Sequence, residues 1–232
     1  MINVCAILLA GGIGSRMKTE IPKQFLPLNG IPLISYSIEA FSSVSAINEI
    51  VIVCDPQYRS IISEHHSIVF AAPGERRQDS LYNGIHAATS EPTMFCVHDA
   101  ARPFLTPEMI TRVINAAQRC GAAAAALPIT YTVKEASVDG KVHRTLDRSM
   151  LWEVQTPQAV HAEILNNAFT KTIEEGIAVT DDVALAELVG CEVQLVQGSR
   201  ENIKITTPED LLLAKYYLEH GTQAHIQAYH RL

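Results

Sequence analysis

The sequence predicts an α/β fold in which helices cover both faces of a mostly parallel β-sheet and a polar β-arm protrudes from it. Two patterns lead to this prediction. Short apolar runs of strand length alternate with longer segments of helical periodicity, which is typical of a parallel sheet with helical crossovers. A polar stretch at about residues 131–156 interrupts the alternation and carries a hairpin signal. We therefore expect one domain, residues 1–232, with the arm as an insertion.

The first half of the chain contains regular strand and helix signals. Apolar runs predict strands at residues 3–9, 47–54, 68–71, 93–97 and 122–129. Apolar residues at helical spacing predict helices at 32–41, at 57–65 and through Leu81, Ile85 and Ala88. Thr106 is a typical N-cap with a proline directly after it, so a further helix is expected from there to residue 120, where Gly121 ends it.

The second half departs from this alternation before returning to it. Residues 131–155 are extended and polar, and Asp139-Gly140 between Val138 and Val142 predicts a hairpin with a type I′ turn. Because a two-stranded arm is only marginally stable alone in water, we expect it to lie against the partner of a homodimer. After the arm we expect helices at 162–175, at 180–189 and from 207 to about 221, a strand at 192–196, and a loose tail at 222–232.

Composition limits the classes of function. The chain has 232 residues, of which 47% are hydrophobic, enough for one large α/β core. Its formal net charge of −7 argues against a nucleic-acid or anionic-membrane partner, since both require a dense basic surface. No apolar run reaches the ~18 residues of a membrane span, and the first residues lack the features of a signal peptide. Five cysteines are scattered without metal-site spacing, so we expect a cytoplasmic protein with reduced thiols.

A glycine-rich stretch, AGGIGSRMKTEIPKQF at residues 10–25, follows the first predicted strand. Gly11, Gly12 and Gly14 have no Cβ, so backbone N–H groups can approach an anion closely at this turn. Arg16 and Lys23 bring two cations to the same loop. This combination suits a polyphosphate, whereas the alternative interpretation is a glycine turn with solvated charges.

Two common phosphate-binding motifs do not fit this stretch. A Walker A loop requires Gly-Lys-Ser/Thr after its last glycine, and this chain has Gly14-Ser15-Arg16. A dinucleotide fingerprint requires a third glycine where Met17 stands and an acidic residue about 20 positions later at the end of the second strand. The second predicted strand ends at Asp55, which is too late.

Polar groups recur at the ends of other predicted strands. Arg77 and Ser80 stand where a helix begins, so its N-terminus could face a nucleotide base and phosphate. Asp99 follows an apolar strand and suits Mg²⁺, which takes one or two carboxylates with phosphate oxygens and water. The same carboxylate could instead cap a turn or pair with Arg102, and His98 is expected to be structural. Because ligands bind at the carboxyl edge of an open parallel sheet, one cleft could hold the glycine loop, residues 74–80 and Asp99.

Six segments in this order and spacing resemble the 2-C-methyl-D-erythritol 4-phosphate cytidylyltransferase family of nucleotidyltransferases. They are AGGIGSRMKTEIPKQF, GERRQDS, VHDAARP, LDRSMLWEVQTPQ, TDDVAL and NIKITTPEDL, and the resemblance covers residues 3 to about 218. It implies a Rossmann-like domain, a homodimer formed through the arm, and transfer of CMP from CTP to 2-C-methyl-D-erythritol 4-phosphate with release of pyrophosphate. This step belongs to non-mevalonate isoprenoid precursor synthesis.

The resemblance also implies roles for individual residues. Four would be catalytic: Arg16, Lys23, Arg148 and Lys204. Nine would bind the nucleotide: Ala10, Gly11, Gly12, Gly14, Arg16, Lys23, Gly74, Arg77 and Ser80. Five would bind the acceptor: Asp99, Thr132, Arg148, Thr156 and Lys204. Asp99 would help to hold Mg²⁺ or another divalent cation, and Arg148 would reach in from the partner's arm.

Two alternatives stay open at this point. The same scaffold resembles ribitol 5-phosphate cytidylyltransferase, since a pocket around Arg148, Thr156 and Lys204 would bind either acceptor phosphate. The chain could also be a nucleotide-binding regulatory protein without catalysis, which the retained Arg16, Lys23, Asp99 and Lys204 disfavour. In addition, the family usually has an aspartate where this chain has Tyr131 at the entry to the arm.

Overall fold

The computed structural model describes residues 2–12, 14, 17, 19–62 and 68–221. At its centre is a seven-stranded sheet with the order β11-β7-β10-β6-β1-β4-β5. The strands, named in chain order, are β1 (Val4–Leu9), β4 (Ile47–Val53), β5 (Ile68–Ala71), β6 (Met94–Asp99), β7 (Ala122–Pro128), β10 (Trp152–His161) and β11 (Val193–Gln197). All neighbours pair in parallel except β10, which runs antiparallel to both β6 and β7. The predicted mostly parallel sheet is therefore confirmed.

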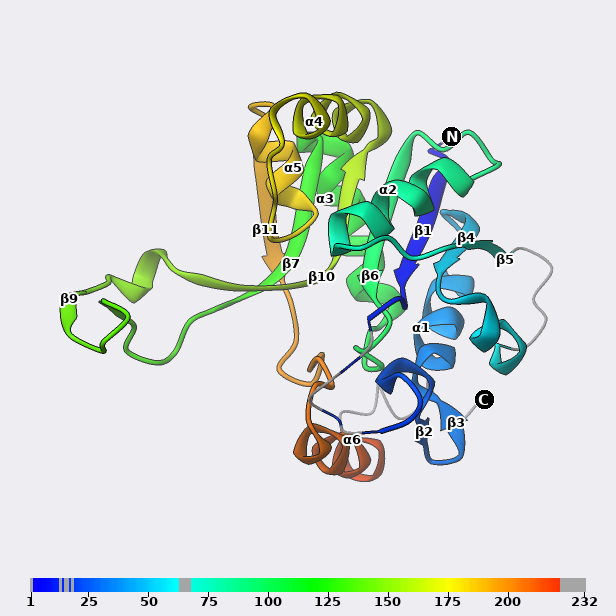
Figure 1. Cartoon of the computed structure of the whole chain (residues 1–232), viewed down its shortest axis with the longest axis horizontal. Helices are drawn as coiled ribbons and strands as arrows, with labels where there is room; N and C mark the ends of the chain where they lie inside the picture. The colour runs from blue at the N-terminus through cyan, green and yellow to red at the C-terminus, as the bar shows by residue number, and fades with distance from the viewer. Residues whose placement is uncertain (1, 13, 15–16, 18, 63–67, 222–232) are drawn as a thin grey trace.

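Helices cover both faces of this sheet (Figure 1). Side chains alternate along β1, so Val4, Ala6 and Leu8 belong to one core cluster while Cys5 and Ile7 belong to the other. The first cluster includes residues of α1 (Leu33–Ser42) and α3 (Pro107–Cys120). The second includes residues of α2 (Arg77–Ala87), α4 (Ala162–Glu175) and α5 (Val183–Leu188). Strands buried on both faces in this way read as continuous apolar runs, which is why their sequences were recognisable.

A third, smaller core cluster includes a residue of the glycine loop. It joins α6 (Pro208–His220) to the β2–β3 ribbon (Pro27–Leu28 and Ile31–Pro32), and its buried members include Met17 and Phe104. Thr207 and Asp210 form a capping box that starts α6. Within the described parts of the chain, every helix is too short or too polar to cross a lipid bilayer.

Two predicted elements differ from the structure. The helix expected at 57–65 is a short 3-10 helix, η3 (Pro56–Ile61), and residues 63–67 lie outside the described residues, as does the expected tail at 222–232. No strand was expected between residues 155 and 162, yet β10 enters the sheet there. Its inward side chains include Gln155, Thr156 and Gln158, which are buried but hydrogen-bonded. Because these residues are polar, the segment lacks the apolar signal of a central strand.

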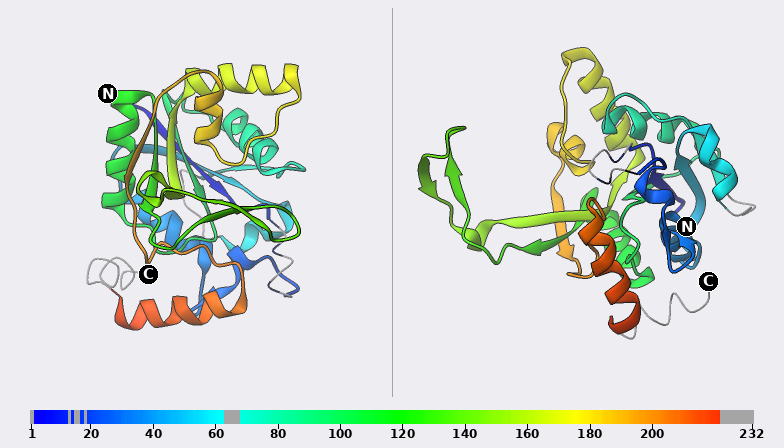
Figure 2. Two further views of the ribbon diagram at one scale, coloured as in Figure 1. Left: turned by 90° about the vertical axis from the view of Figure 1, so that its left-hand side faces the viewer. Right: turned by 60° about the horizontal axis from the view of Figure 1, so that its bottom comes forward.

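The polar arm projects away from the rest of the molecule (Figures 1 and 2). It contains the antiparallel pair β8 (Lys134–Ala136) and β9 (Val142–Thr145), followed by the 3-10 turn η4 (Arg148–Met150). The hairpin is confirmed, but its turn is not type I′, because that turn needs a positive φ at both central residues and only Gly140 has one, at +82°. Ser137 and Lys141 close a three-residue loop instead.

The glycine that ends α3 provides a test of how tightly the chain packs against Ile164 and Cys191. Gly121 has a φ of +97°, and a Cβ there would lie 2.8 Å from both Cys191 Sγ and Ile164 Cδ1. Gly176 ends α4 with a φ of +67°, but no described atom lies within 4 Å of its Cβ position. We expect Gly176→Ala to lower the free energy of unfolding by about 1 kcal/mol through backbone strain alone. Gly121→Ala should lower it by roughly 1–3 kcal/mol more, because it adds overpacking. Urea denaturation of the two variants measures the difference, and equal losses would contradict the crowding at Gly121.

Candidate active site

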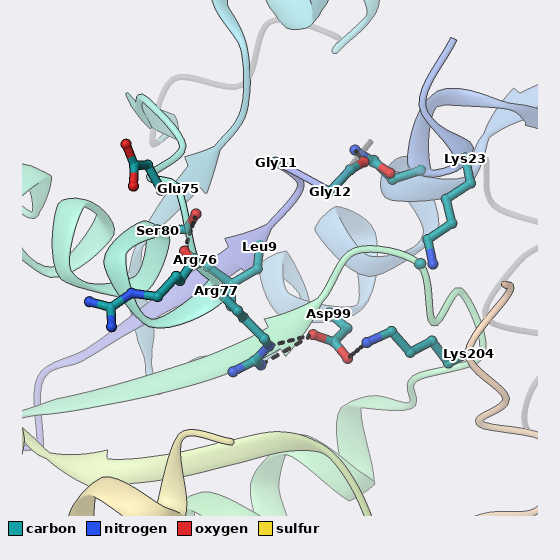
Figure 3. Close-up of a pocket in the computed structure, with 12 residues that line it drawn as sticks. Leu9, Gly11, Gly12, Lys23, Glu75, Arg76, Arg77, Ser80, Asp99 and Lys204 are labelled. Carbon is teal, nitrogen blue, oxygen red and sulfur yellow. Dashed lines mark hydrogen bonds and ion pairs between the residues drawn. The ribbon is translucent and has the colours of Figure 1, made fainter. Parts of the chain in front are cut away.

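A cavity of about 230 Å³ opens at the carboxyl end of the parallel strands (Figure 3). Four segments that are far apart in the sequence meet there: the loop after β1, the turn that begins α2, the end of β6, and the stretch between β11 and α6. The residues that line it are Leu9, Gly11, Gly12, Lys23, Gln24, Glu75, Arg76, Arg77, Ser80, Asp99, Ala101 and Lys204. The structure therefore brings the predicted glycine loop, residues 74–80 and Asp99 into one cleft.

The glycine loop is held close to its neighbours. A Cβ on Gly11 would lie 2.5 Å from the Cβ of Pro73, so only glycine allows this approach to the loop after β5. The buried side-chain amide of Gln24 donates to the carbonyl oxygens of Ala10 at 2.5 Å and Gly12 at 3.1 Å. These bonds fix the backbone path at the cavity wall.

Lys23 is a cation of this loop that the structure describes. It begins the 3-10 helix η2 (Lys23–Phe25), and its alkyl chain packs beside Gly14, where a Cβ would lie 3.4 Å from Lys23 Cγ. Gly14 also has a φ of +68°, which favours glycine. Figure 3 shows the Lys23 amine on the side of the cavity where Asp99 and Lys204 lie. Arg16, the other predicted cation, lies outside the described residues.

The turn before α2 is equally tight. A Cβ on Gly74 would lie 2.4 Å from Asp79 Cβ, and the Gly74 N–H donates to Ser80 Oγ at 3.0 Å. Ser80 Oγ in turn donates to the Arg76 carbonyl oxygen at 3.2 Å. Ser80 lines the cavity, whereas Gly74 contributes through the shape of the turn. The positive end of the α2 dipole therefore faces the cavity, where it favours an anion.

Asp99 is the centre of a charge cluster. Its side chain is 11% exposed and pairs with Arg77 at 3.1 Å, Lys204 at 2.8 Å and Arg102 at 3.8 Å. Burial alone would raise the pKa of Asp99, but Arg77 and Lys204 outweigh it and hold that pKa well below its usual range. The ion pair with Arg102 that the sequence left open is present, and it is the longest of the three.

Thr156 and His98 form a hydrogen-bonded chain that holds the backbone amide of Asp99. The Asp99 N–H donates to Thr156 Oγ1 at 3.1 Å, and Thr156 Oγ1 lies 2.9 Å from His98 Nδ1. His98 Nε2 donates to the Arg102 carbonyl oxygen at 3.0 Å, so Nδ1 carries no proton and accepts from the threonine hydroxyl. The predicted structural role of His98 is confirmed. The described linings of the site's cavities do not include Thr156, whose predicted contact with the acceptor stays a prediction.

A second, larger cavity of about 610 Å³ adjoins the first, and Lys204 lines both. Its wall includes Arg102, Tyr131 and Asn202. Arg102 Nη1 donates to the Asn202 carbonyl oxygen at 2.8 Å, and Asn202 Nδ2 donates to the Thr156 carbonyl oxygen at 2.8 Å. Asn202 begins the NIKITTPEDL segment, but no role was predicted for it, because its side-chain contacts reach across 46 or more residues.

The two predicted arm residues lie apart from the first cavity. Thr132 precedes β8, and Arg148 begins η4, where its Nη1 donates to the Thr130 carbonyl oxygen at 2.6 Å. Figure 2 shows that the arm points away from the body of its own chain. A role for these residues in the cavity therefore requires a second chain.

Asp99 can supply one ligand to a divalent cation whose other ligands come mainly from a substrate. Among the described residues, no group of three or more His, Cys, Asp or Glu side chains could hold a metal ion. Mg²⁺, however, commonly uses one or two carboxylates together with phosphate oxygens, and Asp99 supplies one carboxylate to the cavity wall. Both of its oxygens already face cations, so a metal would compete with Lys204, whose side chain is 39% exposed.

Comparison with known proteins gives a consistent result. The model of the family described as 2-C-methyl-D-erythritol 4-phosphate cytidylyltransferase matches residues 4–220. A protein of that name from Chlamydia pneumoniae is 42% identical over 218 residues, covering 94% of this chain and 100% of that protein. A chloroplastic one from Oryza sativa subsp. japonica is 42% identical over 218 residues, covering 92% of this chain and 73% of that protein. The crystal structure of 4-diphosphocytidyl-2C-methyl-D-erythritol synthase from Anaerococcus prevotii has a TM-score of 0.84 at 29% identity, covering 94% of this chain and 97% of that chain.

The burial of His98 predicts a pH dependence of stability. Burial lowers the pKa of His98 from its ordinary value near 6.5 to about 4. Between these values the unfolded chain binds a proton that the folded chain does not, so stability falls as the pH drops from about 6.5 to 4, by up to ~3 kcal/mol. Urea denaturation at several pH values measures this loss. His98→Gln keeps a donor for Arg102 but does not titrate, so its stability should fall less over the same range. The exposed His86→Gln is the control, and a wild-type slope in the His98 variant would refute the prediction.

Proposed function

Because the chain belongs to the 2-C-methyl-D-erythritol 4-phosphate cytidylyltransferase family, we propose how its residues transfer CMP from CTP to 2-C-methyl-D-erythritol 4-phosphate. The chain is a nucleotidyltransferase, and its products are 4-diphosphocytidyl-2-C-methyl-D-erythritol and pyrophosphate, on the non-mevalonate route to isoprenoids. The observation that carries the assignment of roles is the cluster of cations around Asp99, at the cavity that the glycine loop borders.

The reaction needs charge compensation more than it needs a base. The acceptor phosphate is already an anion, so one of its oxygens forms a bond to the α-phosphorus while the bond from that phosphorus to the oxygen bridging to the β-phosphate breaks. Pyrophosphate leaves with the electron pair of the broken bond. The barrier is the repulsion between anions, which preorganised cations and N–H groups offset. His98 is not needed as a base in this scheme. Both of its ring nitrogens are already hydrogen-bonded, to the Arg102 carbonyl oxygen and to Thr156 Oγ1.

The nucleotide occupies the first cavity in this proposal. Lys23 and the backbone at Ala10, Gly11 and Gly12 contact the triphosphate, and Gly14 supplies the left-handed turn beside the Lys23 side chain. Arg16 shares this role as a prediction from the sequence. Gly74, Arg77 and Ser80 bind the nucleoside and phosphates at the N-terminus of α2. Asp99 would help to hold Mg²⁺, which when bound neutralises charge on the phosphate oxygens.

The acceptor lies beside Lys204, which lines both cavities. Its ammonium group can therefore meet a phosphate that enters from the second cavity and approaches the nucleotide in the first. Thr156 acts by holding the backbone amide of Asp99 in place. Arg102 stands in the wall of the second cavity and adds positive charge there. The names of the relatives favour methylerythritol phosphate over ribitol 5-phosphate as this acceptor.

Thr132 and Arg148 complete the site from the arm of a partner in this proposal. Large apolar side chains on the arm are exposed in the single chain: Tyr131 by 82%, Met150 by 78% and Val142 by 58%. Exposure of several large apolar side chains on one arm favours burial against another chain, and an isolated hairpin needs such support. The functional unit is then a homodimer of single-domain chains, 1–232, which we expect in the cytoplasm.

Replacing Lys23 tests its catalytic role. Lys23→Ala should fold normally but reduce the rate of pyrophosphate release from CTP and methylerythritol phosphate by about 10²- to 10³-fold, because one preorganised cation is lost. Lys215→Ala, on the exposed face of α6, is the matched control and should keep wild-type turnover. Near-normal activity in Lys23→Ala at an unchanged melting temperature would count heavily against the assignment. Parallel assays with ribitol 5-phosphate measure the preference for the acceptor.

Subunit mixing tests whether the arm acts in trans. Arg148→Ala and Lys23→Ala homodimers should each be nearly inactive, since every site lacks one cation. In a heterodimer, the Arg148→Ala body receives an intact arm, so an equal mixture should recover about a quarter of wild-type activity after exchange. Native mass spectrometry verifies that exchange occurred. No recovery in a verified mixture would show that each site is built from one chain.

A further inference from the structure

Asp182 is a buried acidic residue that holds one of the cavity's cations from outside the cavity. Its side chain is 1% exposed, and its two oxygens accept from Arg77 Nη1 at 2.5 Å and Nη2 at 2.8 Å. The described lining of the first cavity includes Arg77 but not Asp182. The bonds to Arg77 explain the position of Asp182 without any contact to the substrates.

Arg77 is clamped between two carboxylates. Besides its bonds to Asp182, it donates to Asp99 Oδ1 through Nε at 3.3 Å and through Nη2 at 3.1 Å. These bonds engage four of the five N–H groups of the guanidinium, two toward each carboxylate. Because the guanidinium is planar, Asp182 determines the plane in which Arg77 meets Asp99.

Asp182 is itself fixed by the sheet. Its N–H donates to Gln158 Oε1 at 2.9 Å, and the N–H of Val183 donates to the same oxygen at 3.0 Å. Gln158 is 2% exposed and belongs to β10, next to β6, which ends in Asp99. Asp182 and Asp99 are thus anchored to neighbouring strands, and Arg77 spans the gap between them.

We propose that Asp182 is a positioning residue for cytidylyl transfer: it fixes the orientation of Arg77 and, through Arg77, the Asp99 carboxylate at the cavity. This inference rests on the proposed function and adds a residue that does not touch the substrates. An arginine side chain that is not held loses rotamer entropy when it is ordered. With Asp182 in place, the Arg77 side chain loses its rotamer entropy when the chain folds and not during the reaction. An alternative role, in which the pair only stabilises the fold, makes different predictions.

Asp182→Asn removes the charge but keeps the size and one acceptor oxygen. We expect kcat to fall by roughly 10- to 100-fold, because small misplacements of catalytic groups have effects of this size. The KM for CTP should change much less, since Asp182 makes no contact with the cavity. Asp181→Asn is the matched control: Asp181 accepts from the Ala184 N–H at 3.0 Å and from Gln158 Nε2 at 3.3 Å but does not bond to Arg77. Asparagine keeps an acceptor oxygen there, so wild-type kcat is expected. A purely structural Asp182 would lower the melting temperature and leave kcat of the folded enzyme unchanged.

A double-mutant cycle shows whether Asp182 acts through Arg77. Adding Asp182→Asn to Arg77→Ala should cause no further loss of kcat/KM beyond about 2-fold, because the group that Asp182 orients is already absent. Losses that multiply would overturn the inference. Should Asp182→Asn fail to fold, Arg77→Lys places a cation between the same carboxylates without the planar fork. It should lose at least about tenfold in kcat, and wild-type kcat in that variant would also overturn the inference.

Nitrogen NMR of the arginine side chains separates this inference from the proposed function. The Arg77 signal is assigned by its absence in Arg77→Lys, and slow rotation of its guanidinium is expected in the wild type. Faster rotation is expected in Asp182→Asn and not in Asp181→Asn. Rotation that is equally slow in Asp182→Asn would refute the positioning role. A wild-type chain without pyrophosphate release would refute the proposed function, while the rotation measurement would still decide what Asp182 does.

Discussion

The pairing of the buried Asp99 carboxylate with surrounding cations is the interaction on which the site depends. A carboxylate taken out of water without compensation would bind a proton, but Arg77, Lys204 and Arg102 keep this one ionised. The cations are in turn held by other groups, Arg77 by Asp182 and Arg102 by the Asn202 carbonyl oxygen. Three cations face two acidic side chains in this cluster, and Lys23 adds a further cation at the glycine loop, so positive charge is in excess there. This surplus suits the phosphate groups that the reaction must bring together.

Much of the fold could be predicted from the sequence, because strands buried on both faces are apolar throughout. The runs that became β1, β4, β6 and β7 carried this signal most clearly, and the N-cap at Thr106 marked the start of α3. β10 was missed for a physical reason. Its Gln155 and Gln158 side chains are buried, but their partners are backbone groups of distant segments, which no local pattern reveals. Long-range hydrogen bonds replaced the apolar burial on which the prediction relied.

The site was predictable where its residues form short sequence motifs. Glycines that allow close approach, a lysine beside them and an aspartate at a strand end all form short motifs, and the structure gathers them around one cavity. The contacts that support these residues were not found in this way. Arg77 was predicted to bind the nucleotide, but its partner Asp182 lies 105 residues further along the chain, and no local motif links the two. Only the folded chain shows that its carboxylate faces an arginine.

The path of β10 has a mechanical consequence. Trp152 and Val154 pair with the end of β7 beneath the arm, and Gln158 to His161 pair with β6 in the middle of the sheet. Thr156, which holds the Asp99 amide, lies between these two stretches. One continuous strand therefore joins the base of the arm to the threonine that holds the Asp99 amide. Any displacement of the arm would have to be absorbed within the few residues between Val154 and Gln158, where the pairing of β10 is irregular.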